Sequence, residues 1–96
     1  MAPLPVRAVR RSSDVVVTFT KPLQMLSGAS ANAFELCGPS GGSCRYALAR
    51  AKGPEVTITG DGQPITRVRY AWADYPIINL YDADLLPVPV FELTVQ

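Results

Sequence analysis

The chain has 96 residues, of which 48% are hydrophobic and 18% charged, which suits one compact domain and excludes two. The chain has nine basic and eight acidic residues, and its net charge of +1 gives no general attraction for nucleic acid or an anionic membrane. The sequence contains no histidine, which excludes a Ser-His-Asp triad, a Cys-His dyad and a histidine metal ligand within it. Any function must therefore be inferred from local groups of other residues.

No apolar run reaches the roughly 18 residues that a membrane-spanning helix requires, and the first five residues lack the apolar stretch of a signal peptide. We therefore expect a soluble chain with no membrane partner. An initiator methionine before a proline-flanked segment favours a single domain, residues 1–96, excised from a larger protein. A natural short reading frame would look the same.

Period-two alternation, β-branched residues and regularly spaced turn signals predict an all-β fold without long helices. The first two strands are expected at residues 6–10 and 14–20, joined as a hairpin. Three consecutive valines in the second strand suggest burial on both of its faces. Residues 21–32 are expected to form a long loop whose apolar side chains cap the core.

A second hairpin is expected to join residues 34–37 to residues 44–50 through a turn rich in glycine and serine. Further strands are expected at residues 55–59, 65–73 and 91–95, separated by turn and proline-rich segments. Together these elements predict one small antiparallel β-sandwich of about seven strands. Its topology is expected to be immunoglobulin-like or jelly-roll-like.

The segment Gly38-Pro39-Ser40-Gly41-Gly42 matches G-x-S-x-G, the nucleophile elbow of α/β-hydrolases. That elbow must open a helix and needs a histidine partner, whereas Ser40 lies at the tip of an expected hairpin in a chain without histidine. We therefore interpret the match as a structural turn.

Cys37 and Cys44 flank the same turn, so they can face one another on paired strands at a distance that suits a disulfide. Such a bond indicates an oxidising compartment, and two buried thiols in a cytosolic protein are the alternative. Two cysteines without histidine cannot make an ordinary structural zinc site. We expect no metal and no cofactor.

Asp74, Asp82 and Asp84 lie close together in the sequence, and carboxylates beside backbone carbonyls can bind Ca²⁺. Their spacing does not match an EF-hand loop, and a calcium site needs six or more oxygens. We therefore expect solvated loop acids.

Four of the eight aromatic residues, Tyr70, Trp72, Tyr75 and Tyr81, fall within twelve positions. Period two would place Tyr70 and Trp72 on one strand face. Such a cluster can form a stacking platform for sugar rings or a partner surface, because tyrosine and tryptophan combine apolar area with a polar tip. Packing in the core or between domains is the alternative, and we favour it because aromatic residues chiefly supply buried area.

Two runs near the C-terminus, VRYAWADYP at residues 68–76 and NLYDADLLPVPVF at residues 79–91, resemble a known family. They are similar to the C-terminal end of sialate O-acetylesterases and related SGNH-type carbohydrate esterases. This resemblance covers about a quarter of the chain. At two points the sequence departs from the family pattern, since Leu85 stands where glycine is usual and Val90 separates a proline and phenylalanine that are normally adjacent.

The resemblance implies an enzyme whose serine and histidine lie in motifs that do not occur in this sequence, so it supplies no catalytic residue here. It implies a non-catalytic C-terminal domain of a secreted or periplasmic esterase that removes acetyl groups from sugars. Its partner would be the catalytic SGNH domain of the same polypeptide, and we expect a monomer. The positions expected to pack against that domain or to shape its cleft are Tyr70, Trp72, Asn79, Tyr81, Pro87 and Phe91.

Two other functions remain open. A carbohydrate-binding module would hold a glycan through Trp72 and neighbouring tyrosines such as Tyr70. An independent adhesion or interaction domain would need no esterase partner. A domain that normally docks should also expose an apolar patch of several hundred Å², which we expect around residues 72–91.

Overall fold

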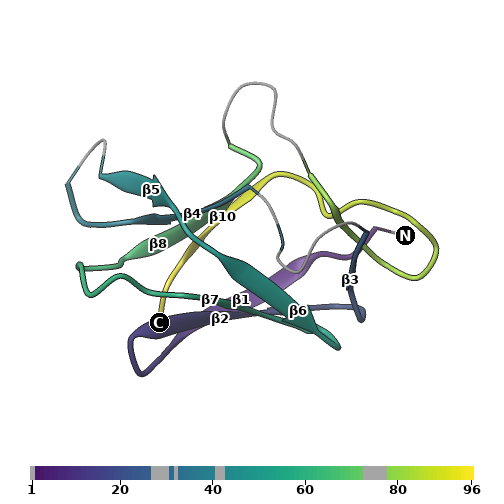
Figure 1. Cartoon of the computed structure of the whole chain (residues 1–96), viewed down its shortest axis with the longest axis horizontal. Coiled ribbons are helices and arrows are strands. Elements are labelled where there is room, and N and C mark those ends of the chain that lie inside the picture. Colours follow the sequence, from purple (N-terminus) through teal and green to yellow (C-terminus); the bar gives the residue numbers. More distant parts are fainter. Residues whose placement is uncertain (1, 27–30, 32, 41–42, 73–77) are drawn as a thin grey trace.

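The computed structural model describes residues 2–26, 31, 33–40, 43–72 and 78–96. Within these residues the secondary structure consists of strands and turns, and no helix is long and apolar enough to cross a membrane. Eight strands form two sheets that face each other, and two short strands form a separate pair (Figure 1). The strands are β1 (Pro5–Arg11), β2 (Asp14–Phe19), β3 (Gln24–Met25), β4 (Phe34–Cys37), β5 (Cys44–Tyr46), β6 (Ala49–Lys52), β7 (Glu55–Ile58), β8 (Arg67–Tyr70), β9 (Leu80–Tyr81) and β10 (Phe91–Thr94).

The strand order is β1-β2-β7-β6 in one sheet and β10-β8-β4-β5 in the other, and β3 pairs with β9. Neighbouring strands within each sheet are antiparallel. This order is that of an immunoglobulin-type sandwich. The sheet β1-β2-β7-β6 corresponds to the immunoglobulin strands A, B, E and D, and the strands β10, β8 and β4 correspond to G, F and C. Strand β5 takes the place of an added C′ strand, and the short pair of β3 and β9 lies outside this pattern. The prediction of a small all-β sandwich is confirmed in its immunoglobulin-like form.

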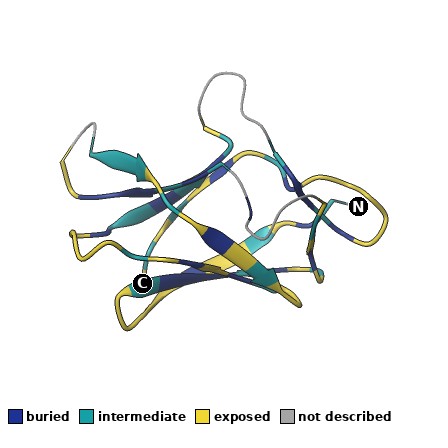
Figure 2. Cartoon of the chain, viewed as in Figure 1, coloured by how far each residue is buried: buried dark blue, intermediate teal, exposed yellow. Residues whose placement is uncertain are grey.

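The core lies between the two sheets and follows from the alternation along each strand (Figure 2). Val15 and Val17 point into it from β2, and Val56 and Ile58 from β7. Val16, between them, is also buried, which confirms that β2 is covered on both faces.

A parallel bridge between Ala8 and Val95 connects the first strand to the end of the chain. The Arg10 backbone N–H donates to the carbonyl of Gln96 at 3.0 Å, and the Gln96 N–H donates to the carbonyl of Ala8 at 2.9 Å. These bonds cover one edge of each sheet, where unpaired backbone groups would otherwise be open to other chains.

Two expectations about local elements were wrong. Residues 44–50 are not one strand, because the chain crosses from one sheet to the other at residues 47–48, which leaves β5 and β6 in different sheets. This division adds an eighth strand to the main sheets. Residues 21–32 were expected to be a loop throughout, but they contain the short strand β3. Their expected role in capping the core is confirmed for Leu23 and Ala31, which are buried in it, whereas Leu26 is about half exposed.

Candidate functional site

The aromatic residues of one sheet form a row inside the sandwich. Phe34, Tyr70 and Phe91 lie side by side on β4, β8 and β10, because the strand register pairs Tyr70 with both phenylalanines. The ring centroids of Phe34 and Tyr70 are 4.8 Å apart, and those of Tyr70 and Phe91 are 5.7 Å apart. Phe19 on the opposite sheet meets Phe91 edge to face at 5.8 Å. Burying rings in this way stabilises the core.

The hydroxyl of Tyr70 is buried in this row and has no hydrogen-bond partner among the described residues. Burial raises the pKa of Tyr70 to about 12, with a smaller contribution from nearby Tyr81. A buried hydroxyl without a partner loses its hydration and gains nothing in return. Tyr70 is therefore a core residue whose polar atom destabilises the fold.

Substituting Tyr70→Phe is expected to raise the free energy of unfolding by about 1 kcal/mol, because it removes that hydroxyl and keeps the ring. Unfolded tyrosine ionises near pH 10, whereas folded Tyr70 stays neutral to about 12, so wild-type stability should fall as the pH rises across this interval. Urea unfolding at pH 7 and through this interval measures both effects. Exposed Tyr46→Phe is the control, and a loss of stability in Tyr70→Phe would show that the hydroxyl has a partner.

Trp72 lies apart from Tyr70, and the expectation that they share one strand face was wrong. β8 ends at Tyr70, and Ala71 has a φ of 56°, which breaks the alternation before Trp72. Trp72 is 47% exposed, whereas Tyr70 is fully buried. The predicted Tyr70/Trp72 stacking platform is therefore not formed by Tyr70.

Arg69 connects Trp72 to the outer surface of its sheet. Its guanidinium carbon lies 4.7 Å from the centroid of the Trp72 ring, within the range of a cation–π contact. Its Nε also donates to the Glu92 carboxylate at 2.6 Å, and Arg67 Nη1 donates to the same oxygen at 3.2 Å. The bond from Arg69 is the largest cause of the lowered pKa of Glu92. One face of the Trp72 ring is therefore in contact with a guanidinium group whose position is fixed by Glu92.

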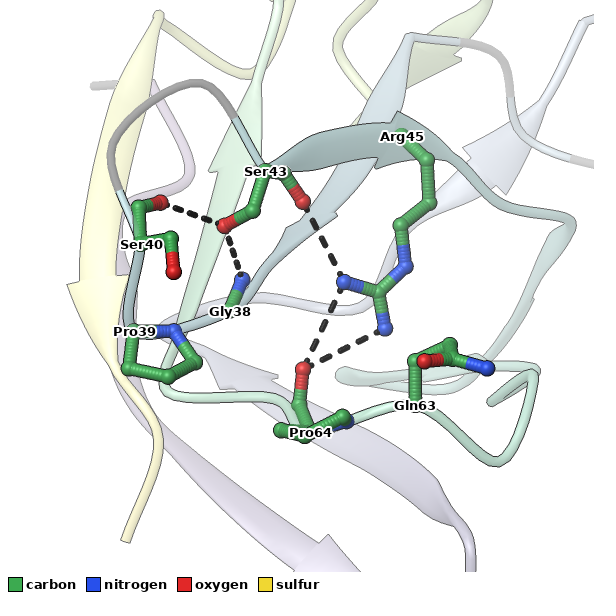
Figure 3. Close-up of a pocket in the computed structure, with 7 residues that line it drawn as sticks. All are labelled: Gly38, Pro39, Ser40, Ser43, Arg45, Gln63 and Pro64. Atoms are coloured by element: carbon green, nitrogen blue, oxygen red, sulfur yellow. Dashed lines mark hydrogen bonds between the residues drawn. The ribbon is translucent and has the colours of Figure 1, made fainter.

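A hollow of about 320 Å³ lies where the β4–β5 turn meets the segment between β7 and β8 (Figure 3). Its lining residues are Gly38, Pro39, Ser40, Ser43, Arg45, Gln63 and Pro64. The Ser43 hydroxyl accepts the Gly38 N–H at 3.0 Å and donates to the Ser40 carbonyl, so it holds the turn in shape. A disulfide between Cys37 and Cys44 closes the base of the turn, as predicted.

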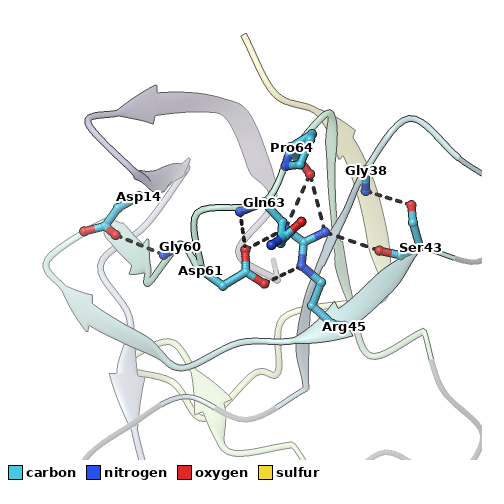
Figure 4. Close-up of polar contacts among 8 residues, drawn as sticks. All are labelled: Asp14, Gly38, Ser43, Arg45, Gly60, Asp61, Gln63 and Pro64. Atoms are coloured by element: carbon cyan, nitrogen blue, oxygen red, sulfur yellow. Dashed lines mark hydrogen bonds and ion pairs between the residues drawn. The ribbon is translucent and has the colours of Figure 1, made fainter.

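Arg45 occupies one wall of this hollow and is already paired. Its Nε and Nη2 donate to the two carboxylate oxygens of Asp61 at 2.7 and 2.8 Å, and it also reaches the carbonyl of Pro64 at 3.4 Å (Figure 4). The bond from Arg45 is the main cause that lowers the pKa of Asp61 to about 2. This pair joins the edge strand β5 to the segment between β7 and β8, and it leaves the guanidinium few donors for a ligand.

Substituting Asp61→Asn is expected to lower the urea midpoint at neutral pH by removing this bidentate pair. Ionised Asp61 stabilises the fold above its ordinary pKa of 3.8, and the contribution is lost as the pH falls through about 2. The difference between wild type and variant should therefore shrink across that interval. A difference that stays constant down to the lower pH would show that the ion pair contributes nothing.

The G-x-S-x-G match lies beside this hollow. Ser40 lies in a turn between strands and not at the start of a helix, so the G-x-S-x-G match lacks the context of a nucleophile elbow. No histidine exists in the sequence to act as its base. Interpreting this segment as a structural turn agrees with its place in the fold.

The acidic residues expected in a solvated loop behave differently from one another. Asp82 is only 2% exposed, and backbone N–H groups, with that of Leu86 first, lower the pKa of its carboxyl. Asp84 is exposed, and Asp74 lies outside the described residues. The described part of the chain contains no cluster of three histidine, cysteine or acidic residues that could hold a metal.

The other residues predicted for a surface lie at different depths. Asn79 and Phe91 are buried, Tyr81 is half-buried, and Pro87 is exposed. Pro87 forms an isolated bridge to Tyr81. Asn79 and Phe91 therefore support a surface from beneath, whereas Tyr81 and Pro87 lie where a partner could reach them.

The comparison with solved structures finds a carbohydrate acetylesterase from Xanthomonas citri, with 29% sequence identity and a TM-score of 0.80. The match covers 95% of this chain and 22% of that chain, so this chain spans about a fifth of the length of the esterase. No family model and no curated protein sequence matches the chain. The partial coverage fits an accessory domain of a carbohydrate esterase.

Proposed function

We propose that this chain is a non-catalytic accessory domain that packs against the catalytic domain of a carbohydrate esterase and shapes its cleft. The supporting observation is the similarity to an acetylesterase over nearly the whole of this chain but only 22% of that enzyme. The resemblance of residues 68–76 and 79–91 to sialate O-acetylesterases adds a finer proposal. In it, the partner is an SGNH-type domain of the same polypeptide that hydrolyses O-acetyl esters on sugars.

The composition supports a non-catalytic role. Hydrolysis of an acetyl ester through a serine nucleophile needs a general base within hydrogen-bond reach. The sequence has no histidine, and the Ser43 hydroxyl is already used to hold its own turn. The chain would therefore contribute to a parent enzyme through a stable surface for packing and not through catalysis.

The disulfide supports a secreted or periplasmic location. Disulfides persist in oxidising compartments and are rare in the reducing cytosol. Cys37 and Cys44 are bonded, and the sequence holds no other cysteine. A compartment outside the cytosol would also give the parent enzyme access to polymeric carbohydrate.

The function can be tested in the Xanthomonas citri acetylesterase, in its intact form, with the matched segment deleted, and with that segment replaced by this chain. We expect the deletion to lower the temperature of half-inactivation and the replacement to restore at least half of the difference. The readout is acetyl release from an acetylated oligosaccharide. A replaced form that contains the folded domain, shown by an intact disulfide and protease resistance, but inactivates like the deletion would contradict the proposal. The isolated chain should release no acetate.

Glycan binding is a second candidate, favoured by the exposure of Trp72 and its contact with Arg69. An aromatic ring with a fixed polar neighbour suits the faces and hydroxyls of sugars. Trp72 is the single tryptophan, so its fluorescence reports on this site alone. Saturable fluorescence changes on titration with plain or acetylated oligosaccharides, at about millimolar affinity or tighter, would support this function. The Trp72→Ala variant, followed by its backbone amide shifts, should then show no binding. A flat titration would contradict it.

A further inference from the structure

The loop that follows β9 is held in one shape by Asp82. Its carboxylate Oδ1 accepts the backbone N–H groups of Asp84 and Leu86 at 2.9 and 3.0 Å. Its Oδ2 lies 3.4 Å from Lys21 Nζ, and its carbonyl accepts a bond from Gln24 Nε2 at 3.0 Å. A buried carboxylate with this many hydrogen-bond partners holds its loop more rigidly than a solvated carboxylate could.

The loop held in this way carries leucines at its tip. Leu85 is 60% exposed and has a φ of 63°, in the left-handed region that residues other than glycine rarely adopt. That conformation is strained for a residue with a Cβ. Leu86 beside it is also exposed. Strained residues that are held in place by their surroundings concentrate at functional positions.

Two further exposed leucines lie at the same end of the sandwich. Leu4 is connected to this loop through the residues that follow β2: its carbonyl accepts the Thr20 N–H at 2.9 Å, and the next residue, Lys21, pairs with Asp82. The Leu26 N–H donates to the carbonyl of Asn79, just before β9, at 2.9 Å. We call this set of residues the leucine end, and their exposed fractions run from 36% to 60%: Leu4, Leu26, Leu85 and Leu86.

The sheet faces differ from the leucine end in their chemistry. The outer face of the β10-β8-β4-β5 sheet carries the Arg67, Arg69 and Glu92 ion pairs. On the other sheet, exposed charged residues such as Arg7 and Lys52 lie among two exposed valines of β1, Val6 and Val9. Charged faces of this kind are disfavoured in the centre of an interface, where apolar groups predominate.

We propose that the leucine end is the surface through which this domain docks on the catalytic region of its parent esterase, an inference that rests on the proposed function. The partner surface is apolar and complementary to a protruding pair of leucines. The position of the N-terminus supports this occupant, because any domain joined ahead of residue 2 would be tethered beside Leu4 and held there at high effective concentration. In the similar esterase most of the chain lies outside the matched segment, and that remaining part is long enough to contain a catalytic domain.

The test uses the acetylesterase in which this chain replaces the matched segment, with Leu85→Ser and Leu86→Ser combined. Leu48→Ser is the matched control, because Leu48 is 69% exposed between β5 and β6 and is not one of the residues of the leucine end. We expect the double variant to lose at least half of the thermal protection that the chain confers, and the control to keep it. The urea midpoint of the isolated chain should stay close to the wild-type value in both variants, because the substituted side chains are exposed.

The outcomes separate the inference from the function on which it rests. If the unsubstituted replacement protects the esterase and the double variant protects it equally, the leucine end is not the docking surface, while the accessory function stands. If the unsubstituted replacement gives no protection, both are overturned. If sedimentation shows that the isolated chain dimerises and that the double variant dissociates it, the occupant is a second copy and the proposed partner is wrong.

Discussion

Substituting Gly60→Ala is expected to lower the free energy of unfolding by about 3 kcal/mol, near the upper end for overpacking. A Cβ at this position would overlap the backbone carbonyl oxygen of Ser13 and lie 2.8 Å from its carbonyl carbon. The β1–β2 turn cannot simply move away, because the Gly60 N–H donates to Asp14 Oδ1 at 3.0 Å and holds that turn in place (Figure 4).

Gly53→Ala is the matched control for this effect. Gly53 has a positive φ of 59°, but no other atom lies within 4 Å of the place that an added Cβ would take, so its substitution costs only the backbone conformation, about 1 kcal/mol. Urea unfolding of both variants at pH 7 measures the difference. Equal losses in the two variants would show that the contact between Gly60 and Ser13 is not a tight one.

Removing the disulfide with Cys37→Ala and Cys44→Ala is expected to lower the free energy of unfolding by about 2.5 kcal/mol, the loop-closure value for eight residues. For a domain of this size, that loss corresponds to a fall in Tm of about 10–20 °C. The effect should be large because a small sandwich has only one core to stabilise it.

Calorimetry of the double variant, of the oxidised wild type and of the wild type with a reductant measures this contribution. The reduced wild type should melt near the double variant, because both lack the same bond. If all three melted at one temperature, the bond between β4 and β5 would contribute nothing to stability.

The parts of the fold that depend on local signals could be predicted from the sequence. The hairpin of β1 and β2 follows from alternation on both sides of a polar turn, and the disulfide follows from the spacing of two cysteines across a second turn. The crossing at residues 47–48 could not be predicted, because neither a glycine nor a proline marks it. The change of sheet there is determined by packing between distant strands.

The candidate site was predicted less well. Alternation predicted one face for Tyr70 and Trp72, but the left-handed conformation of Ala71 separates them, and alanine gives no signal for that conformation. The pair of Arg45 and Asp61 joins residues 16 positions apart, so no short motif reveals it. Asp82 resembled a solvated loop acid, although an aspartate that accepts N–H groups two and four residues later is a local feature that could have suggested a fixed turn.

Hydrogen exchange of the replaced acetylesterase, compared with exchange of the isolated chain, tests most directly whether this domain docks through its leucine end. We predict slower exchange at residues 82–86 and at Leu26 in the joined protein, and unchanged exchange at the β1–β2 turn, which lies at the opposite end of the sandwich (Figure 1). Identical exchange at the leucine end in the two proteins would contradict the proposed docking.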